Sequence, residues 1–213
     1  MLALFDLDGT LVDRDAGLRA WAVEFCVDRG LDPAEADWLV AADGDGRVAK
    51  EEFFGQIRER YGLTDSLAAL FGQYAERQPT LIPVFDGVLE GLALLRLAGW
   101  RLGVVTNGYQ VVQTNTLVAT GIAKHVDGWA ISGAENIWKP DVRLFEIAAE
   151  RAGGKLGQDG WMVGDSTADI IGGAAAGLRT IWIHHDRAWP AGEPEPTVTA
   201  SSPADGAAVI LGG

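Results

Sequence analysis

After about residue 83 the sequence alternates between short apolar runs and longer amphipathic segments, and this alternation limits the possible folds more than any other feature. Short apolar runs are typical of buried strands, and apolar residues spaced three and four apart indicate helices. Strands that alternate with helices require crossover connections and therefore predict a parallel sheet. The predicted strands are 2–5, 101–105, 129–131, 161–163 and 180–183, and the predicted helices are 88–97, 111–119, 142–152 and 168–176. A proline-rich loop is predicted at 188–196. It precedes a weaker strand near Val198 and a helix near 204–211.

A block of helical sequence interrupts this alternation directly after the first strand. Between residues 15 and 78 the apolar residues recur at helical spacing, as in Leu18, Trp21 and Phe25. Within the block, Pro33 fits the first turn of a helix that Asp32 caps. We therefore expect this segment to form a separate helical domain inserted into the α/β core.

Polar residues follow the first two predicted strands at the points where they end. Asp6 and Asp8 come after the first strand and can project to the same side, because strand side chains alternate with a period of two. Thr106 and Asn107 come after the strand at 101–105, and their polar groups and backbone N–H groups suit phosphate oxygens. Because ligands bind outside the carboxyl ends of strands in open α/β sheets, we expect these side chains to meet.

Three more charged residues are predicted at the same edge of the sheet. Lys139 is expected to begin the helix at 142–152, and Asp165 and Asp169 are four residues apart at the start of the helix at 168–176, where they could also act as capping acids. Acids gathered around one lysine suit a hard cation and an anionic group, and Mg²⁺ prefers oxygen ligands. The cation would offset the mutual repulsion that otherwise raises the pKa of neighbouring acids. The sequence therefore predicts Mg²⁺ as the cofactor.

Four segments occur in an order that resembles a known family. They are FDLDGTLVD at 5–13, VVTNG at 104–108, IWKPD at 137–141 and VGDSTAD at 163–169. Together they resemble the four motifs of the haloacid dehalogenase superfamily, and the insertion after the first motif is similar to the subclass with a helical cap. The resemblance implies a Rossmann-like, three-layer α/β catalytic core formed by 1–14 and 86–213, with an α-helical cap domain at 15–85.

The resemblance also implies a role for each residue of the catalytic motifs. Asp6 would be the nucleophile that forms an aspartyl-phosphate. Asp8 would be the general acid for the leaving alcohol and then the general base for water. Thr106 and the backbone of Asn107 would hold the phosphoryl group, and Lys139 would balance the charge of Asp6 and the phosphate.

The metal site is assigned by the same resemblance. Asp6, the backbone carbonyl of Asp8, and Asp165 would hold Mg²⁺. Asp169 would be a ligand directly or through water, or would orient Lys139.

Composition excludes several classes of partner. The 213-residue chain carries a formal net charge of −13, which argues against nucleic acid and anionic membranes because both favour basic surfaces. No apolar run is long enough to span a bilayer, and a first strand that begins at residue 2 leaves no room for a signal peptide. The single cysteine allows no intrachain disulfide. These features predict a cytoplasmic protein, and they say nothing about its oligomeric state.

Four residues outside the motifs are candidates for contact with substrate. Arg14 lies at the start of the inserted block, Arg47 and Lys50 lie within it, and Tyr109 follows the second motif. For Arg47 and Lys50, a solvated face is the simpler interpretation.

Two further patterns predict structural roles rather than a site. Asp43, Asp45 and Gly46 match part of a calcium-loop pattern, but Ala41 occupies the first ligand position, so we expect an acidic turn followed by a helix. His184 and His185 occupy adjacent positions after a strand and would face opposite ways, which suits structural or surface roles better than a ligand pair.

The leading functional hypothesis is a Mg²⁺-dependent phosphatase that acts on a small phosphorylated metabolite. True dehalogenases of the resembling superfamily lack the second acid of the first motif, so Asp8 argues against dehalogenation. A sugar phosphomutase uses the same DxDGT motif and remains open. A non-catalytic module that accepts or binds phosphate is a third alternative, although such a module would need neither Asp8 nor a long cap.

Overall fold

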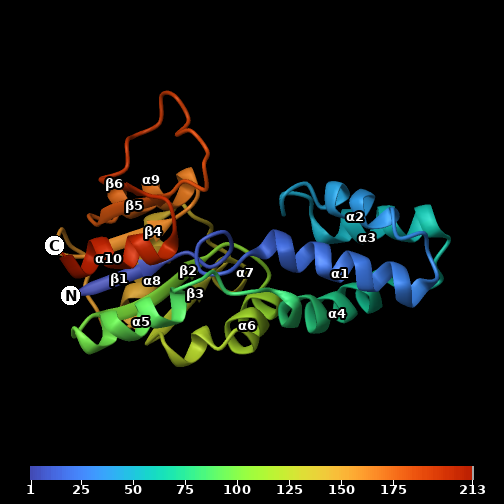
Figure 1. Ribbon diagram of the computed structural model, residues 1–213, viewed down its shortest axis with the longest axis horizontal. Coiled ribbons are helices and arrows are strands. Elements are labelled where there is room, and N and C mark those ends of the chain that lie inside the picture. The colour runs from blue at the N-terminus through green and yellow to red at the C-terminus, as the bar shows by residue number, and fades with distance from the viewer. Residues whose placement is uncertain (213) are drawn as a thin grey trace. The chain divides into compact units, whose positions relative to one another are not determined.

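The computed structural model describes residues 1–212 and shows two compact units. The first unit joins Met1–Asp13 to the chain from Val84 onward, and the second unit is Arg14–Pro83 (Figure 1). Within the first unit, Val12 bridges to Val84 and the Phe85 N–H donates to the Leu11 carbonyl at 3.2 Å. These contacts hold the chain side by side at the two points where it leaves the first unit and returns to it. The inserted segment therefore does not interrupt the sheet.

The first unit is built on a parallel sheet, as the alternation of strands and helices predicts. Every neighbouring pair of strands runs parallel, and the order across the sheet is β3-β2-β1-β4-β5-β6. Strand β1 is therefore central and is buried along its whole length, which explains its uninterrupted apolar sequence. The strands are β1 (Leu2–Phe5), β2 (Arg101–Thr106), β3 (Gly128–Ile131), β4 (Trp161–Gly164), β5 (Arg179–Ile183) and β6 (Val198–Ala200).

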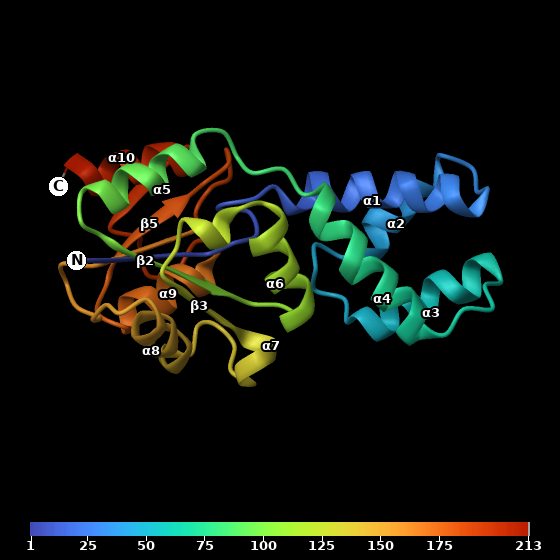
Figure 2. The same cartoon turned by 90° about the horizontal axis from the view of Figure 1, so that it is seen from below.

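Helices cover both faces of the sheet and complete the predicted three-layer α/β fold. Helices α5 and α10 pack together on one face, and α8 and α9 pack together on the other (Figure 2). The helical segments of this unit are α5 (Val88–Leu97), α6 (Gln110–Ala119), η2 (Ile122–Lys124), α7 (Ser132–Glu135), α8 (Val142–Arg151), α9 (Thr167–Ala175) and α10 (Pro203–Gly212).

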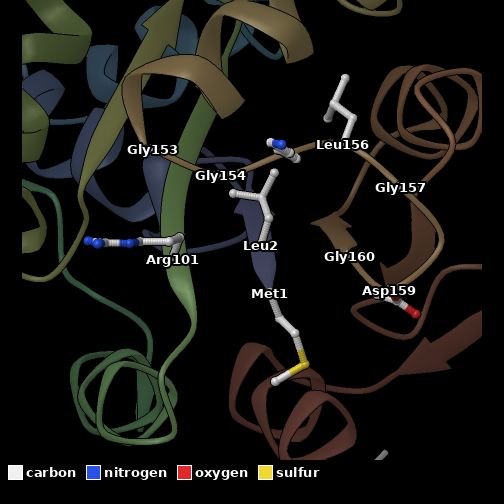
Figure 3. A pocket seen from close by; sticks show the side chains of 10 residues that line it. Met1, Leu2, Arg101, Gly153, Gly154, Leu156, Gly157, Asp159 and Gly160 are labelled. Carbon is white, nitrogen blue, oxygen red and sulfur yellow. The ribbon is translucent and has the colours of Figure 1, made fainter.

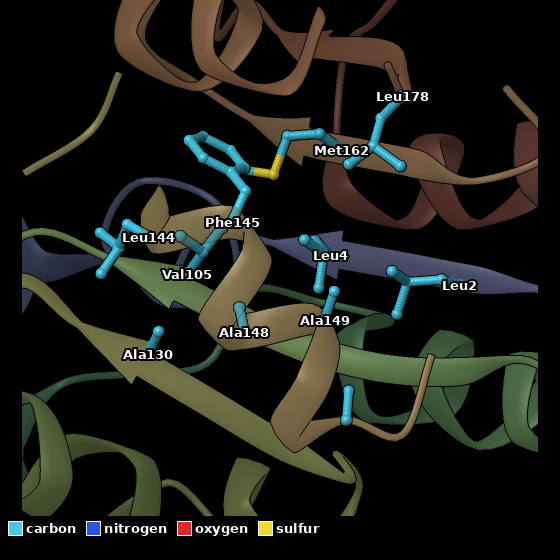
Figure 4. Packing of buried hydrophobic residues seen from close by; sticks show 11 residues of the cluster. Leu2, Leu4, Val105, Ala130, Leu144, Phe145, Ala148, Ala149, Met162 and Leu178 are labelled. Atoms are coloured by element: carbon cyan, nitrogen blue, oxygen red, sulfur yellow. The ribbon is translucent and has the colours of Figure 1, made fainter. Parts of the chain in front are cut away.

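The core between α8 and the sheet is fully apolar. Phe145 of α8 lies against Met162 of β4, and Leu4 of β1 is buried beside Val105 of β2 (Figure 4). Burying each such side chain contributes about 1.5–3 kcal/mol to folding. This packing fixes the strands whose carboxyl ends carry the motif residues.

The second unit is helical throughout and has its own aromatic core. The ring of Trp21 lies 5.0–6.3 Å from the rings of Phe25, Phe53, Phe54 and Tyr74, measured between ring centroids. The amphipathic pattern of residues 15–78 therefore arises from one shared interior. Its segments are α1 (Arg14–Arg29), α2 (Glu35–Asp43), α3 (Lys50–Tyr61), α4 (Leu67–Arg77) and the 3₁₀ helix η1 (Gln78–Leu81).

The predicted start of one helix in this unit is wrong by two residues. Pro33 lies in a turn that precedes α2 rather than in its first helical turn. The Asp32 carboxylate accepts from Ala34 N–H at 2.9 Å, and the Asp32 carbonyl accepts from Glu35 N–H at 2.9 Å. These short-range bonds form a turn before the helical pattern begins at Glu35.

No helix within residues 1–212 is long and apolar enough to cross a membrane.

Candidate active site

Asp6 occupies the first position beyond the central strand β1. Its backbone N–H donates to the Val163 carbonyl at 2.9 Å, which continues the pairing with β4. Its Oδ1 accepts from the N–H of Leu7 at 2.7 Å, which fixes the orientation of the carboxylate. With only 6% of its surface exposed, Asp6 is a buried acid that requires compensating charge.

Lys139 supplies that charge. Its Nζ lies 2.6 Å from Asp6 Oδ1 and 2.7 Å from Asp169 Oδ1, and it donates to the Val105 carbonyl at 3.0 Å. All three ammonium hydrogens therefore have acceptors, and the lysine joins the ends of β1 and β2 to α9.

The prediction that Lys139 begins a helix is wrong. Helix α8 begins at Val142, and Asp141 is its N-cap because the Asp141 carboxylate accepts from Arg143 N–H at 3.0 Å. Lys139 lies in the preceding loop, where its backbone N–H donates to Asn107 Oδ1 at 2.9 Å. This bond to the loop after β2 places the lysine at the carboxyl edge of the sheet without any helical turn.

The pKa values in this cluster show the balance of burial and charge. Burial raises the pKa of Asp6 well above its ordinary range, the nearby Asp169 adds to the increase, and the Lys139 ammonium only partly opposes it. Burial lowers the pKa of Lys139, but Asp169 and Asp6 outweigh that effect, so its pKa lies above the ordinary value and the lysine stays charged. Burial and Asp169 likewise raise the pKa of Asp165, against the opposing effect of Arg187.

Asp165 and Asp169 come from the end of β4 and the start of α9. Asp169 is the third residue of α9 and forms a capping box, because its Oδ2 accepts from the N–H of Ser166 at 3.0 Å and from the Ser166 hydroxyl at 2.6 Å. Its other oxygen binds Lys139. Asp169 therefore combines the capping role and the lysine-orienting role that the sequence left as alternatives.

The three acids Asp6, Asp165 and Asp169 are arranged to share a cation. Each contributes a carboxylate oxygen that lies within 4.8 Å of the others. Gly9 makes room for the group, since a Cβ at this position would lie 2.7 Å from Asp165 Oδ2. Clustered carboxylates are the hard oxygen donors that Mg²⁺ takes, so these residues fit the predicted ion.

Thr106 and Asp8 are joined by a residue that the sequence analysis did not identify. The Gln113 side chain, on α6, donates from Nε2 to Thr106 Oγ1 at 2.8 Å and to Asp8 Oδ2 at 3.0 Å. Gln113 is almost fully buried. A lone glutamine in an amphipathic helix carries no sequence signal of such a contact.

Two residues that follow β5 also reach the site. Arg187 donates to Asp165 Oδ2 at 2.9 Å and to the Asp165 carbonyl at 3.0 Å. His185 Nε2 lies 2.6 Å from the Gly9 carbonyl, and its ring lies 5.2 Å from that of Phe85. His184 caps the following turn, where its Nδ1 accepts from Asp186 N–H at 3.0 Å. The two histidines thus have separate structural contacts.

Of the four candidate specificity residues, Tyr109 lies in the first unit and Arg14, Arg47 and Lys50 lie in the helical unit. Tyr109 is the exposed N-cap residue of α6, and Arg47 is exposed in the helical unit. Arg14 and Lys50, also in the helical unit, both form ion pairs with the fully buried Asp43.

The expectation of a solvated face is therefore wrong for Lys50. Its Nζ lies 4.8 Å and 4.9 Å from the ring centroids of Phe53 and Tyr74, in addition to its ion pair with Asp43. Aromatic rings and a buried carboxylate together make up for the water that the ammonium loses. The Asp43 carboxylate also forms an ion pair with Arg14. The segment that matches part of a calcium-loop pattern is therefore a structural turn.

A cavity of about 400 Å³ lies at the opposite end of β1 from Asp6 (Figure 3). It is lined by Met1, Leu2, Arg101 and residues of the 153–160 loop, and it contains none of the motif residues. The acidic cluster, rather than this cavity, therefore defines the candidate site.

Comparison with known proteins agrees with the geometry. Residues 3–183 match the haloacid dehalogenase-like hydrolase family. The chain belongs to this family. The match extends from the first strand to the end of β5 and includes all four motifs.

Two curated relatives are named phosphatases. The chain is 30% identical over 192 residues to a plasmid-encoded phosphoglycolate phosphatase of Cupriavidus necator, covering 89% of this chain and 83% of the relative. It is 32% identical over 222 residues to the probable phosphatase IndB of Dickeya dadantii, covering 99% and 94%.

Two solved structures share the fold. A putative β-phosphoglucomutase from Thermotoga maritima superposes with a TM-score of 0.80 at 19% identity, covering 99% of this chain and 98% of that one. The putative hydrolase YfnB of Bacillus subtilis, bound to magnesium, gives a TM-score of 0.75 at 23% identity, covering 98% and 97%.

Proposed function

We propose that this protein is a Mg²⁺-dependent phosphatase that hydrolyses small phosphate monoesters through an aspartyl-phosphate intermediate. One observation carries the proposal: the Lys139 ammonium lies between the carboxylates of Asp6 and Asp169, at the sheet edge where Asp165 completes an acidic cluster. Such a site combines a nucleophile with fixed positive charge, and phosphoryl transfer depends mainly on positioning and electrostatic stabilisation.

In the first step a carboxylate oxygen of Asp6 attacks phosphorus. An acyl-phosphate bond forms as the bond between phosphorus and the ester oxygen breaks. Asp8 donates a proton to the departing alcohol. The Thr106 hydroxyl and the N–H of Asn107 donate to the phosphoryl oxygens, and Lys139 balances the negative charge that collects around Asp6.

In the second step water attacks the phosphorus of the acyl-phosphate. Asp8, now ionised, accepts a proton from that water, and the bond between phosphorus and Asp6 breaks. Inorganic phosphate leaves and Asp6 returns as a carboxylate. The single carboxyl group of Asp8 thus serves both half-reactions with no net gain or loss of protons.

Asp6, Asp165 and the carbonyl of Asp8 are the proposed holders of Mg²⁺. When bound, the ion supplies positive charge to the phosphoryl oxygens and to the acidic cluster. Asp169 lies close enough to contribute, although both of its oxygens already bind Lys139 and Ser166.

The helical unit Arg14–Pro83 is the proposed cap domain, and its residues would select the substrate. Relatives of this chain are named for phosphoglycolate and for phosphoserine, which supports a small phosphorylated metabolite as the substrate. The likeness to a putative phosphoglucomutase concerns the fold alone.

The deciding experiment measures phosphate release from a panel of esters with Mg²⁺ and with EDTA. The panel holds phosphoglycolate, phosphoserine, glycerol 3-phosphate, a nucleoside monophosphate, glucose 6-phosphate and p-nitrophenyl phosphate, and Asp6→Asn is assayed beside the wild type. We expect turnover that needs Mg²⁺ and disappears in the variant. Turnover retained by Asp6→Asn would contradict the mechanism, and isomerisation of a sugar phosphate that depends on its bisphosphate would show a mutase instead.

A further inference from the structure

Gln113 is a buried amide that contacts two residues of the proposed mechanism. It lies in the first turn of α6, where its backbone N–H donates to the Tyr109 carbonyl at 3.0 Å, and its side chain is directed into the core unit. Its Nε2 reaches Thr106 Oγ1 at 2.8 Å, Asp8 Oδ2 at 3.0 Å and the Asn107 carbonyl at 3.4 Å. One amide nitrogen thus connects the ends of β1 and β2.

The loop at Gly108 leaves space for the Gln113 side chain. A Cβ at Gly108 would lie 2.9 Å from Cγ and Cδ of Gln113, so a larger residue at this position would displace the glutamine. The Gly108 N–H donates to Ser132 Oγ at 2.9 Å, which holds the loop in place from its other side. Gln113 therefore occupies a fitted space beside the proposed phosphate-binding loop.

The chemistry of the amide sets the direction of its hydrogen bonds. An NH₂ group only donates, and an ionised carboxylate only accepts. When Thr106 Oγ1 accepts from Gln113, the threonine's own hydrogen must point to another acceptor. In the structure that acceptor is the Asn107 carbonyl at 3.5 Å, and in the reaction it would be a phosphoryl oxygen.

We propose that Gln113 is a positioning residue that orients the Asp8 carboxyl group and the Thr106 hydroxyl for phosphoryl transfer. The proposal rests on the phosphatase function given above. With Oδ2 of Asp8 accepting from the amide, the proton destined for the leaving alcohol is carried by Oδ1. Gln113 also makes Thr106 a donor toward the phosphate.

This role predicts a dependence on the leaving group. The value of kcat/KM reports steps up to the formation of the aspartyl-phosphate, in which Asp8 acts as the acid. An alkoxide is a strong base and needs that proton as it departs, whereas nitrophenolate is a weak base and does not. Loss of Gln113 should therefore lower kcat/KM more for an alkyl phosphate than for p-nitrophenyl phosphate.

The test compares Gln113→Met, which keeps the length of the side chain but removes its donors, with the wild type. The matched control is Gln110→Met, which changes an exposed glutamine of the same helix. For the alkyl phosphate of the panel that is turned over fastest, we expect kcat/KM to fall about 10- to 100-fold, the effect of losing a hydrogen bond to a charged group. For p-nitrophenyl phosphate the fall should be several-fold smaller, and the control should match the wild type with both esters.

The outcomes separate this proposal from the proposed function. An equal loss on both esters would show a merely structural role, and an unchanged kcat/KM would show no role, so either result overturns the proposal while the phosphatase function stands. A wild type that releases no phosphate from any ester overturns both. If Gln113→Met shows no cooperative melting transition, Gln113→Leu removes the same donors without adding a charge beside Asp8 and is subject to the same criteria.

Discussion

The Nζ atom of Lys139 lies 2.6 Å from Oδ1 of Asp6, and both side chains are almost completely buried. The lysine comes from an irregular loop, and the aspartate comes from the end of the central strand. Because Asp169 lies on the other side of the lysine, a single positive charge faces two carboxylates. The cluster therefore keeps excess negative charge in its interior, which favours the binding of a cation.

Replacing Lys139 by methionine should abolish activity and destabilise the protein. The change leaves two buried carboxylates without their partner, which typically costs about 3–5 kcal/mol. The measurement is the free energy of unfolding in urea, with phosphate release measured in parallel. Lys155→Met, at an exposed lysine of the same unit, is the control and should differ from the wild type by less than about 0.5 kcal/mol. A similarly small change for Lys139→Met would argue against the ion pairs.

Gly9→Ala should remove activity for a steric reason. Gly9 has φ +74°, and a Cβ would lie 2.7 Å from the Asp165 carboxylate. Gly30→Ala is a matched control, because Gly30 has φ +63° and no heavy atom within 4 Å of its would-be Cβ. Both variants should lose about 1–2 kcal/mol of stability from the left-handed backbone. Only Gly9→Ala should lose phosphate release, and equal activity in the two variants would remove the steric argument.

Much of the core could be predicted because its strands and helices follow from patterns among residues that are close in the sequence. The apolar runs gave the strands, and residues at strand ends such as Asp6 and Asp165 had to meet at one edge of a parallel sheet. Lys139 was expected at that edge, although not in its irregular loop, because its position depends on a bond to the distant Asn107.

Contacts that depend on tertiary structure could not be predicted from the sequence. Gln113 reaches Asp8 from a different element, and Arg187 reaches Asp165 from the loop after β5. Lys50 looked like a surface residue because neither its carboxylate partner nor the Tyr74 ring follows from helical spacing. Polar residues whose partners are distant in the sequence produce no periodic pattern from which the contact could be predicted.

Mg²⁺ should stabilise the wild type in the absence of any substrate. A ligand that binds only the folded state adds about 2.7 kcal/mol when its concentration is one hundred times Kd. The measurement is the melting temperature in MgCl₂ and in EDTA, where we expect a higher value with the metal. Asp165→Asn should lose this increase, whereas Asp159→Asn, at an exposed acid of the same unit, should keep it. An increase of the same size in all three proteins would place the ion elsewhere.

The helical unit should lose stability in acid through Asp43. Burial raises the pKa of this carboxyl group, but the charges of Arg14 and Lys50 outweigh that effect and hold the pKa below its ordinary value of 3.8. A carboxyl group with a lowered pKa in the folded state contributes stability that is fully present above the unfolded pKa. That contribution is lost as the pH falls through the folded pKa.

Asp43→Asn tests this contribution directly. At neutral pH the variant should be less stable than the wild type by about 3–5 kcal/mol, because it leaves Lys50 and Arg14 without their buried partner. The difference in the free energy of unfolding between the two proteins should become smaller once the pH falls below 3.8, because the wild-type carboxylate itself becomes protonated. Asp45→Asn is the control, since Asp45 is exposed in the same turn and asparagine tolerates its positive φ of 55°. Unfolding in urea across this pH range gives the free energies, and a gap that stayed constant with pH would show that the ionised state of Asp43 contributes nothing.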